Sequence, residues 1–136
     1  MDEQIQVLAQ TIYAEAHDGG LSTMEAIANV VMNRVKHAQK VGSYWWGNNV
    51  KDVCLKPFQF SCWNGVHPFH KWLHKNKNGN LIYGICERIA VRAIKGLLKD
   101  NTHGATHYHS KQINPKWAHA AVPCAEIGNY VFYAHL

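Results

Sequence analysis

Two helical hydrophobic patterns, separated by a pair of glycines, constrain the fold of this chain most. Between residues 3 and 16, apolar side chains recur every three or four positions, which places them on one face of a helix. They are Ile5, Leu8, Ile12 and Ala16. Residues 18–20 (DGG) interrupt the pattern, and paired glycines favour a turn. We therefore predict a helix over residues 3–16 that ends in a sharp corner.

A second helix is expected directly after this corner. Residues 22–25 (STME) fit a capping box, in which the Ser22 hydroxyl and the Glu25 carboxylate bind the free amides at a helix start. The residues predicted for its buried face are Ile27, Val30, Val31 and Val35. The two helices form a hairpin, so a side chain near residue 15 lies where they meet.

The middle of the chain is rich in aromatic residues. Residues 41–66 show no sustained periodicity, and we expect an ordered loop region with about half of its aromatic rings in the core and half lining a cleft. These rings belong to Tyr44, Trp45, Trp46, Phe58, Phe60 and Trp63. Pro68 is expected to open a short helix that runs to about Lys75. A longer helix is predicted from about Ile82 to Lys99, with Ile85, Ile89, Ala93, Ile94 and Leu97 on its buried face.

The C-terminal third has the texture of β-strands. Residues 104–109 (GATHYH) alternate in a way that suits a strand, and residues 130–133 (YVFY) suit another. The predicted fold class is therefore α+β, mainly helical with a small antiparallel β element. A catalytic or binding cleft is expected between the two parts.

Composition narrows the class of protein. With 136 residues, of which 47% are hydrophobic and 17% charged, we expect one globular domain over residues 1–136 that works as a monomer. No segment approaches the roughly 18 apolar residues of a membrane span, so no stable membrane insertion is expected. The net charge of +5 favours polyanionic partners, but the basic residues are scattered, which argues against nucleic acid.

The N-terminus and the cysteines bear on location and redox state. The start MDEQIQVLAQ lacks the basic and apolar regions of a secretory signal, so we expect a protein that stays in the cytoplasm until release, or an excised exported domain. The four cysteines, Cys54, Cys62, Cys86 and Cys124, show no C-x-x-C spacing. Buried thiols, or at most one disulfide, are therefore expected rather than a metal cluster, and no metal or other cofactor is predicted.

Glu15 is the candidate catalytic acid. It lies in the last turn of the first helix, beside the Gly19–Gly20 corner, among apolar and aromatic neighbours. Apolar surroundings disfavour a charged carboxylate and so favour the protonated form that a glycosidase acid needs. A convincing second carboxylate is missing, because Asp18 follows the helix and Asp52 and Glu126 are distant in sequence. A mechanism with one acid, in which a substrate hydroxyl attacks the sugar carbon, fits more easily.

The histidines offer a rival chemistry. His103, His107 and His109 lie within seven residues, and three imidazoles can bind a catalytic zinc ion. A zinc-dependent enzyme is therefore the alternative, although no H-E-x-x-H motif occurs and alternating histidines also line polar clefts.

Six sequence blocks, in order, resemble those of the SleB/CwlJ cell wall hydrolases. They are residues 11–16 (TIYAEA), 28–35 (ANVVMNRV), 59–62 (QFSC), 104–109 (GATHYH), 114–118 (NPKWA) and 127–133 (IGNYVFY). The resemblance implies a lysozyme-like fold and cleavage of the β-1,4 bond between N-acetylmuramic acid and N-acetylglucosamine in peptidoglycan glycan strands. Either hydrolysis by a muramidase or lytic transglycosylation would be the reaction. The alternatives for this substrate are a zinc-dependent N-acetylmuramoyl-L-alanine amidase, which would cut the muramoyl-peptide bond through His103, His107 and His109, and a non-catalytic, aromatic-rich module that binds peptidoglycan.

The resemblance also assigns roles to residues. Glu15 falls on the family's catalytic glutamate, and a lytic transglycosylase would need only this acid if the muramic C6 hydroxyl were the nucleophile. The expected substrate-binding residues are Tyr13, Gln59, Ser61, Thr106, His107, Tyr108 and His109. Where members of the family read EARGE, residues 15–19 read EAHDG, so the second acid of that block is missing and Asp18 stands one position earlier. A compact catalytic domain without a signal peptide resembles a phage endolysin.

Overall fold

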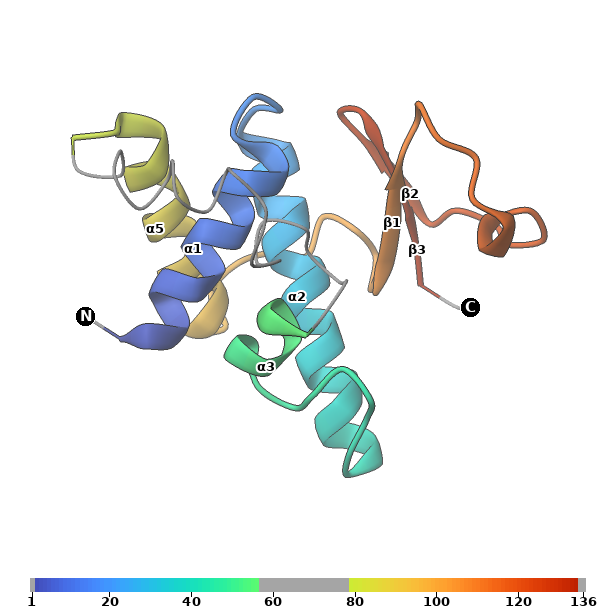
Figure 1. Ribbon diagram of the computed structural model, residues 1–136, viewed down its shortest axis with the longest axis horizontal. Helices are drawn as coiled ribbons and strands as arrows, with labels where there is room; N and C mark the ends of the chain where they lie inside the picture. The colour runs from blue at the N-terminus through green and yellow to red at the C-terminus, as the bar shows by residue number, and fades with distance from the viewer. Residues whose placement is uncertain (1, 57–78, 135–136) are drawn as a thin grey trace.

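The structure, a computed structural model, describes residues 2–56 and 79–134. A group of helices lies on one side of the molecule and a small sheet on the other (Figure 1). The elements are α1 (Glu3–Ala16), α2 (Leu21–Val41), α3 (Val50–Leu55), α5 (Leu81–Ile94), β1 (His107–Ser110), the 3-10 helix η2 (Lys116–Ala118), β2 (Ala125–Ile127) and β3 (Tyr130–Tyr133).

Helix α1 has the predicted bounds. The Asp2 side chain caps its first turn by accepting a hydrogen bond from the Gln4 amide. Leu8, Ile12 and Ala16 are fully buried, so the predicted apolar face is confirmed. This face packs against α2, α3 and α5, which makes α1 the centre of the helical part.

Helix α2 begins differently from the prediction. Gly20 is its N-cap, with φ +86°, and no side chain caps the helix. The predicted capping box is therefore wrong: Ser22 lies inside the first turn, and Glu25 pairs with Arg92 at 3.4 Å. Glycine at the N-cap lets the chain turn back sharply, which α1 and α2 require in order to pack side by side. The predicted buried face is confirmed for Ile27, Val30, Val31 and Val35.

The segment after α2 is partly helical. Asn49 caps the short helix α3 by accepting from the Asp52 amide, within a region predicted to be a loop. Trp46 is 3% exposed, whereas Tyr44 and Trp45 are 40% and 53% exposed. These three rings divide between core and surface as expected. The predictions for Phe58, Phe60, Trp63 and the helix over residues 68–75 lie outside the described residues.

Helix α5 ends earlier than predicted. Asn80 caps its start, and the helix stops at Ile94 rather than near Lys99, because Gly96 adopts φ +74° after the last turn. Leu97, predicted to be buried, is 71% exposed as a result. Ile89 and Ala93 are buried as predicted.

The sheet is antiparallel and has the strand order β1-β3-β2. Strand β2 was not predicted, because it has only three residues and Glu126 at its centre is exposed. The two residues Gly128 and Asn129 join it to β3, so that Ile127 pairs with Tyr130. The prediction of a mainly helical α+β fold with a small antiparallel β element is confirmed.

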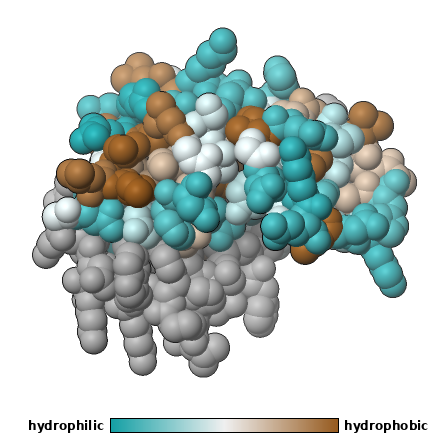
Figure 2. Space-filling model, turned by 90° about the horizontal axis from the view of Figure 1, so that it is seen from above, coloured by the Kyte–Doolittle hydropathy of each residue, from teal (hydrophilic) through white to brown (hydrophobic). Residues whose placement is uncertain are grey.

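The sheet has its own small core against α2. Phe132, which is fully buried, packs there with Ala26, Val30 and Ala105. Hydrophilic residues cover much of the face shown in Figure 2, and hydrophobic residues form several smaller patches among them. None of the described helices is long and apolar enough to cross a membrane.

Candidate active site

Glu15 lies where the helical part meets the sheet. Its side chain is partly buried in the last turn of α1. The Tyr108 hydroxyl, from β1, donates a hydrogen bond to Glu15 Oε1. The Tyr130 hydroxyl, from β3, donates to the Glu15 main-chain oxygen at 2.7 Å. Two tyrosines of the sheet therefore hold the end of α1 that carries the carboxylate.

Tyr108 is a permanent hydrogen-bond donor at this site. Burial raises its pKa well above the usual range, and the negative charge of Glu15 and the hydrogen bond between the two groups raise it further. The phenol therefore keeps its proton at any working pH. Its ring stacks on Phe132 at 5.7 Å and meets Tyr130 edge-on at 5.3 Å, so the hydroxyl is held by packing.

Arg34 is a buried cation in the same region that sequence reasoning did not single out. The residue is 6% exposed, and its Nε donates to the Thr106 carbonyl oxygen at 2.7 Å. Its guanidinium lies 5.5 Å from the centre of the Trp46 ring, and Trp46 Nε1 donates to the Arg34 carbonyl oxygen at 2.9 Å. Burial lowers the pKa of Arg34, while electrostatic coupling to the acidic groups of Tyr108, Cys54 and Glu15 opposes that shift.

Arg34 could have been found in the sequence. It stands between Val31 and Val35 on the predicted buried face of α2, where a charged side chain is rarely placed without a partner. In the structure it ties α2 to the start of β1, two residues before Tyr108.

Strand β1 divides the other predicted site residues between two faces. Successive side chains of a strand point to opposite faces, and Tyr108 faces Glu15. His107 and His109 point to the other face, where both rings contact Trp117 of η2, at 5.9 and 5.6 Å between ring centres. Thr106 precedes the strand, and its Oγ1 shares a hydrogen bond of 2.9 Å with His107 Nδ1.

Each of the three histidines has at least one ring nitrogen in a hydrogen bond within the fold. His109 Nδ1 donates to the Ser110 carbonyl oxygen at 2.8 Å, so its Nε2 accepts from the Tyr133 hydroxyl, also at 2.8 Å. His103 is exposed and contacts the Cys124 carbonyl oxygen at 3.1 Å. Over residues 2–56 and 79–134, no three His, Cys, Asp or Glu side chains are grouped closely enough to hold a metal ion.

Tyr13 and Asp18 differ from Glu15 in their surroundings. Tyr13 is 5% exposed, stacks on His17 and accepts a hydrogen bond from Asn80 Nδ2 at 2.9 Å. Two residues apart on a helix, Tyr13 and Glu15 point in different directions. Asp18 is exposed in the turn after α1. Gln59 and Ser61, predicted to bind substrate, lie outside the described residues.

The cysteines of the described segments are free thiols. Cys54 and Cys86 are buried in the helical core, and Cys124 is partly buried beside the sheet. Burial raises the pKa of the Cys54 thiol to about 12, although hydrogen bonding to Thr11 and the charge of Arg34 oppose the shift. A thiol with so high a pKa is a poor nucleophile, which agrees with its place in the core.

A concave surface opens between α2 and the start of β1. A pocket of about 570 Å³ is lined by Asn33, His37, Tyr44, Trp46, Gly104, Thr106 and Ala134. A second hollow of about 330 Å³ is lined by Tyr44, Trp45, Trp46, Gly47, Asp52, Leu55 and Lys56. Tyr44 and Trp46 line both hollows, and the larger one brings the aromatic segment near residue 45 together with Gly104 and Thr106.

Known proteins were compared with the chain. A family model for Cell Wall Hydrolase matches residues 19–133. The crystal structure of the catalytic domain of the Bacillus cereus SleB protein superimposes with a TM-score of 0.69 at 22% identity, covering 96% of this chain and 88% of that one. The catalytic domain of the germination-specific lytic transglycosylase SleB from Bacillus anthracis gives a TM-score of 0.71 at 22% identity, covering 98% and 95%. No curated protein sequence matches.

These comparisons bear on fold and family. At 22% identity the two SleB domains establish a shared fold, which confirms the expected SleB-like architecture. The family model spans most of the chain and begins at Gly19, after Glu15. The predicted resemblance to the SleB/CwlJ-type hydrolases is confirmed, and the chain belongs to the cell wall hydrolase family.

Proposed function

We propose that this chain cleaves the β-1,4 bond between N-acetylmuramic acid and N-acetylglucosamine in peptidoglycan, with Glu15 as the general acid and base. The observation that carries the proposal is the hydrogen bond from Tyr108 to Glu15 Oε1. It holds a partly buried carboxyl group at the junction of helix and sheet, and we expect the sugar chain to lie against both. Membership of a cell wall hydrolase family supports the substrate class.

The geometry assigns different tasks to the two carboxyl oxygens. When Glu15 is protonated, Oε1 accepts the Tyr108 hydrogen bond, so the acidic proton sits on Oε2. Glu15 donates that proton to the glycosidic oxygen as the bond from this oxygen to the sugar C1 breaks. The resulting carboxylate keeps its hydrogen bond from Tyr108, and such a charge-assisted bond is stronger than a neutral one.

The second half of the reaction needs only a nucleophile that gives its proton to the Glu15 carboxylate. In lytic transglycosylation, the muramic C6 hydroxyl attacks C1 and forms a 1,6-anhydro sugar. In hydrolysis, a water molecule attacks instead and leaves a reducing end. A single acid that first donates and then accepts a proton is sufficient for the first route, which suits a chain whose nearby Asp18 is exposed outside the helix.

The remaining predicted contacts complete the proposal. Thr106 and Tyr108 lie beside the junction that Glu15 occupies, and we expect them, with Gln59 and Ser61, to contact the sugar near the scissile bond. Tyr13 is expected to act from within the core, since it supports the α1 turn that carries Glu15. His107 and His109 lie on the other face of β1, beside Trp117.

Replacing Glu15 with Gln tests the mechanism. Glutamine keeps the shape and can still accept the Tyr108 hydrogen bond, but it cannot donate the acid proton. We expect the release of soluble fragments from purified peptidoglycan to fall by about 10²- to 10⁴-fold. Wild-type activity in this variant would contradict the role of Glu15.

Mass spectrometry of the wild-type products distinguishes the reactions. A muropeptide short of one water identifies transglycosylation, and a reducing end identifies hydrolysis. A freed peptide would instead indicate an amidase, and binding without any released fragment would indicate a non-catalytic module. Either of the last two outcomes would overturn the proposal.

A further inference from the structure

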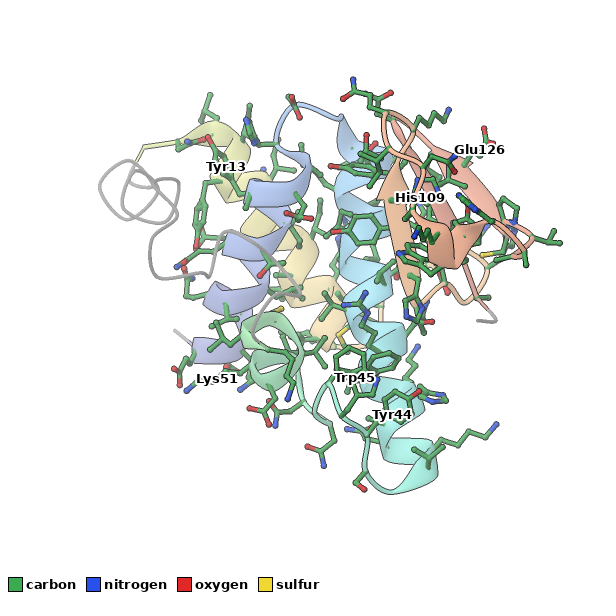
Figure 3. The ribbon with its side chains drawn as sticks, turned by 45° about the vertical axis from the view of Figure 1, so that its right-hand side comes forward. Tyr13, Tyr44, Trp45, Lys51, His109 and Glu126 are labelled. Atoms are coloured by element: carbon green, nitrogen blue, oxygen red, sulfur yellow. The ribbon has the colours of Figure 1, made fainter. Side chains whose placement is uncertain are left out.

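The face of β1 that points away from Glu15 carries a continuous row of aromatic rings. We call it the aromatic band. Its members are Tyr44, Trp45, Trp46, His107, His109 and Trp117. Trp46 contacts Trp45 at 5.5 Å and His107 at 5.9 Å between ring centres. Trp117 continues the row by contacting His107 and His109. Tyr44 and Trp45 lie beside α2, below His109 on the sheet (Figure 3).

The band is largely exposed where it would meet a ligand. Tyr44, Trp45 and Trp117 are 40%, 53% and 45% exposed, although burying such rings is strongly favourable. The buried Trp46 is fixed beneath them by its hydrogen bond to the Arg34 carbonyl oxygen. Exposed aromatic side chains on a fixed base are typical of a binding surface rather than of a solvated one.

The band also borders two pockets that have polar groups at their edges. Tyr44 and Trp46 stand between the pockets of about 570 and 330 Å³. Asn33, His37 and Thr106 border the larger one, and Asp52 and Lys56 border the smaller. A ligand that fits has flat apolar faces for the rings and hydrogen-bonding groups around its rim.

Charge favours an uncharged or weakly anionic ligand. Burial, together with the nearby Arg34 cation, lowers the pKa of His107 to about 4, so the ring at the centre of the band is neutral at ordinary pH. Lys116, next to Trp117, and Lys56 add positive charge at the two ends. Isolated lysines of this kind tolerate acidic substituents but do not form a nucleic-acid surface.

We propose that the aromatic band binds a β-1,4-linked N-acetylhexosamine chain at a surface that adjoins the Glu15 site at Thr106 but does not include the Glu15 carboxylate. In such a sugar the ring substituents are equatorial, so both ring faces present C–H groups that stack on aromatic rings, and the acetamide and hydroxyl groups lie at the rim. Neither pocket has Glu15 or Tyr108 among its described lining residues. The choice of ligand rests on the proposed function, because it takes the glycan to be peptidoglycan.

The band would keep the enzyme on its polymer. A glycan strand held by stacking at one surface raises the effective concentration of neighbouring bonds at the catalytic one. Trp45, Trp117 and Tyr44 are then binding residues that the resemblance did not assign, while His107 and His109 bind glycan here rather than beside the scissile bond.

The test measures binding in the Glu15→Gln variant, so that no cleavage interferes. A hexamer of N-acetylglucosamine is titrated into this variant and followed by calorimetry. We expect Trp45→Ala and Trp117→Ala each to raise Kd about five- to tenfold, because each removes one stacked ring. Trp45→Phe and Trp117→Phe, which keep a ring, should lose much less. Leu97→Ala, at an exposed apolar residue that follows α5 and is not a member of the band, is the matched control and should bind like the parent.

Several outcomes would overturn the proposal. They are a hexamer that does not bind, unchanged affinity in both alanine variants, an equal loss in Leu97→Ala, or binding that high salt abolishes, since stacking on neutral rings is not screened. The result is independent of the catalytic proposal. If Glu15→Gln still cleaved peptidoglycan while the band bound the hexamer as expected, only the catalytic role would be refuted. If Glu15→Gln abolished cleavage while Trp45→Ala and Trp117→Ala bound the hexamer like the parent, only the band would be refuted.

Discussion

Strand β1 presents two surfaces built on different principles. On one face, Tyr108 is packed among Phe132 and Tyr130 and directs a single hydroxyl at Glu15. On the other face, His107 and His109 support the exposed ring of Trp117. The first surface fixes one atom by burial and hydrogen bonding, as a proton transfer requires. The second surface provides apolar ring area but no single hydrogen-bonding group that fixes a ligand, which suits a glycan that slides along it or binds in several registers.

A matched pair of hydroxyl deletions gives the largest effect that separates the two faces. Tyr108→Phe keeps the ring but removes the donor to Glu15, and we expect kcat to fall about 10- to 100-fold, the value of a hydrogen bond to a charged group. KM should change little, because the packing of the ring is retained. Initial rates on purified peptidoglycan over a range of concentrations measure both constants.

The control for this prediction is Tyr133→Phe. Tyr133 is also buried in the sheet, but its hydroxyl donates to His109 Nε2 on the other face. Tyr133→Phe should leave kcat within about twofold of wild type, because the hydroxyl that it removes is neutral and bonds His109, not Glu15. Equal losses of kcat in the two variants would mean that the faces are not functionally distinct.

The second prediction concerns the contact between the β2–β3 turn and the start of α2, which attaches the sheet to the helices. Gly128, in the turn between β2 and β3, has φ +56°, and a Cβ added there would lie 2.4 Å from Thr23 Oγ1. Thr23 is buried at the start of α2. We expect Gly128→Ala to lower the free energy of unfolding by about 2 kcal/mol, through backbone strain and this contact together. Urea denaturation at neutral pH measures it.

Gly104→Ala separates the two causes. Gly104 has φ +83°, but an added Cβ would meet no atom within 4 Å, so only backbone strain is introduced. We expect a loss of about 1 kcal/mol. Because the Gly128 turn leads into Tyr130, whose hydroxyl binds the Glu15 carbonyl oxygen, Gly128→Ala should also lower kcat, whereas Gly104→Ala should not. A larger loss of stability in Gly104→Ala than in Gly128→Ala would show that the contact of the Gly128 turn with Thr23 does not stabilise the fold.

The helices were predictable from the sequence where local patterns decide them. The bounds of α1 follow from its apolar spacing and the two glycines. The capping box at Ser22 failed because Gly20 supplies the turn that the hairpin needs, a demand of tertiary packing that local propensity does not carry. The prediction for α5 was too long for a related reason. Gly96 ends the helix in a left-handed conformation, whereas the apolar residues beyond it continue the helical pattern in the sequence.

The site was predictable as a set of residues but not as an arrangement. Glu15 and Tyr108 lie 93 residues apart in sequence, and only the packing of the sheet on α2 brings their side chains together. The block at residues 106–109 suggested one substrate surface, whereas strand alternation splits it into two. The position of Arg34 on the predicted buried face of α2 marks it as a charge that needs a partner, but only the structure identifies that partner as the Thr106 carbonyl oxygen.

The last prediction concerns the protonation of His107, the ring at the centre of the band. The pKa of His107 is lowered to about 4, from a usual value of 6.5, by burial and by the Arg34 cation. Between these two pH values the unfolded chain takes up a proton that the folded chain does not, so folded stability falls as the pH drops from about 6.5 towards 4. Above pH 6.5 this contribution is fully present. His107→Asn should therefore flatten the dependence of unfolding free energy on pH in this window.

The acidic side of the profile provides the internal control for His107. Asp100 is partly buried, which alone would raise its pKa, but hydrogen bonds from Thr102, Asn33 and Gly104 lower the pKa of this carboxyl below its usual 3.8. Its contribution is present above that value and is lost only at lower pH, so it does not overlap with the His107 window. Urea titrations at pH 7, 5.5 and 4.5 should thus show a slope in the wild type that His107→Asn reduces. An unchanged slope would mean that the ring is protonated in the folded chain, and that the central ring of the band is a cation, not a neutral stacking surface.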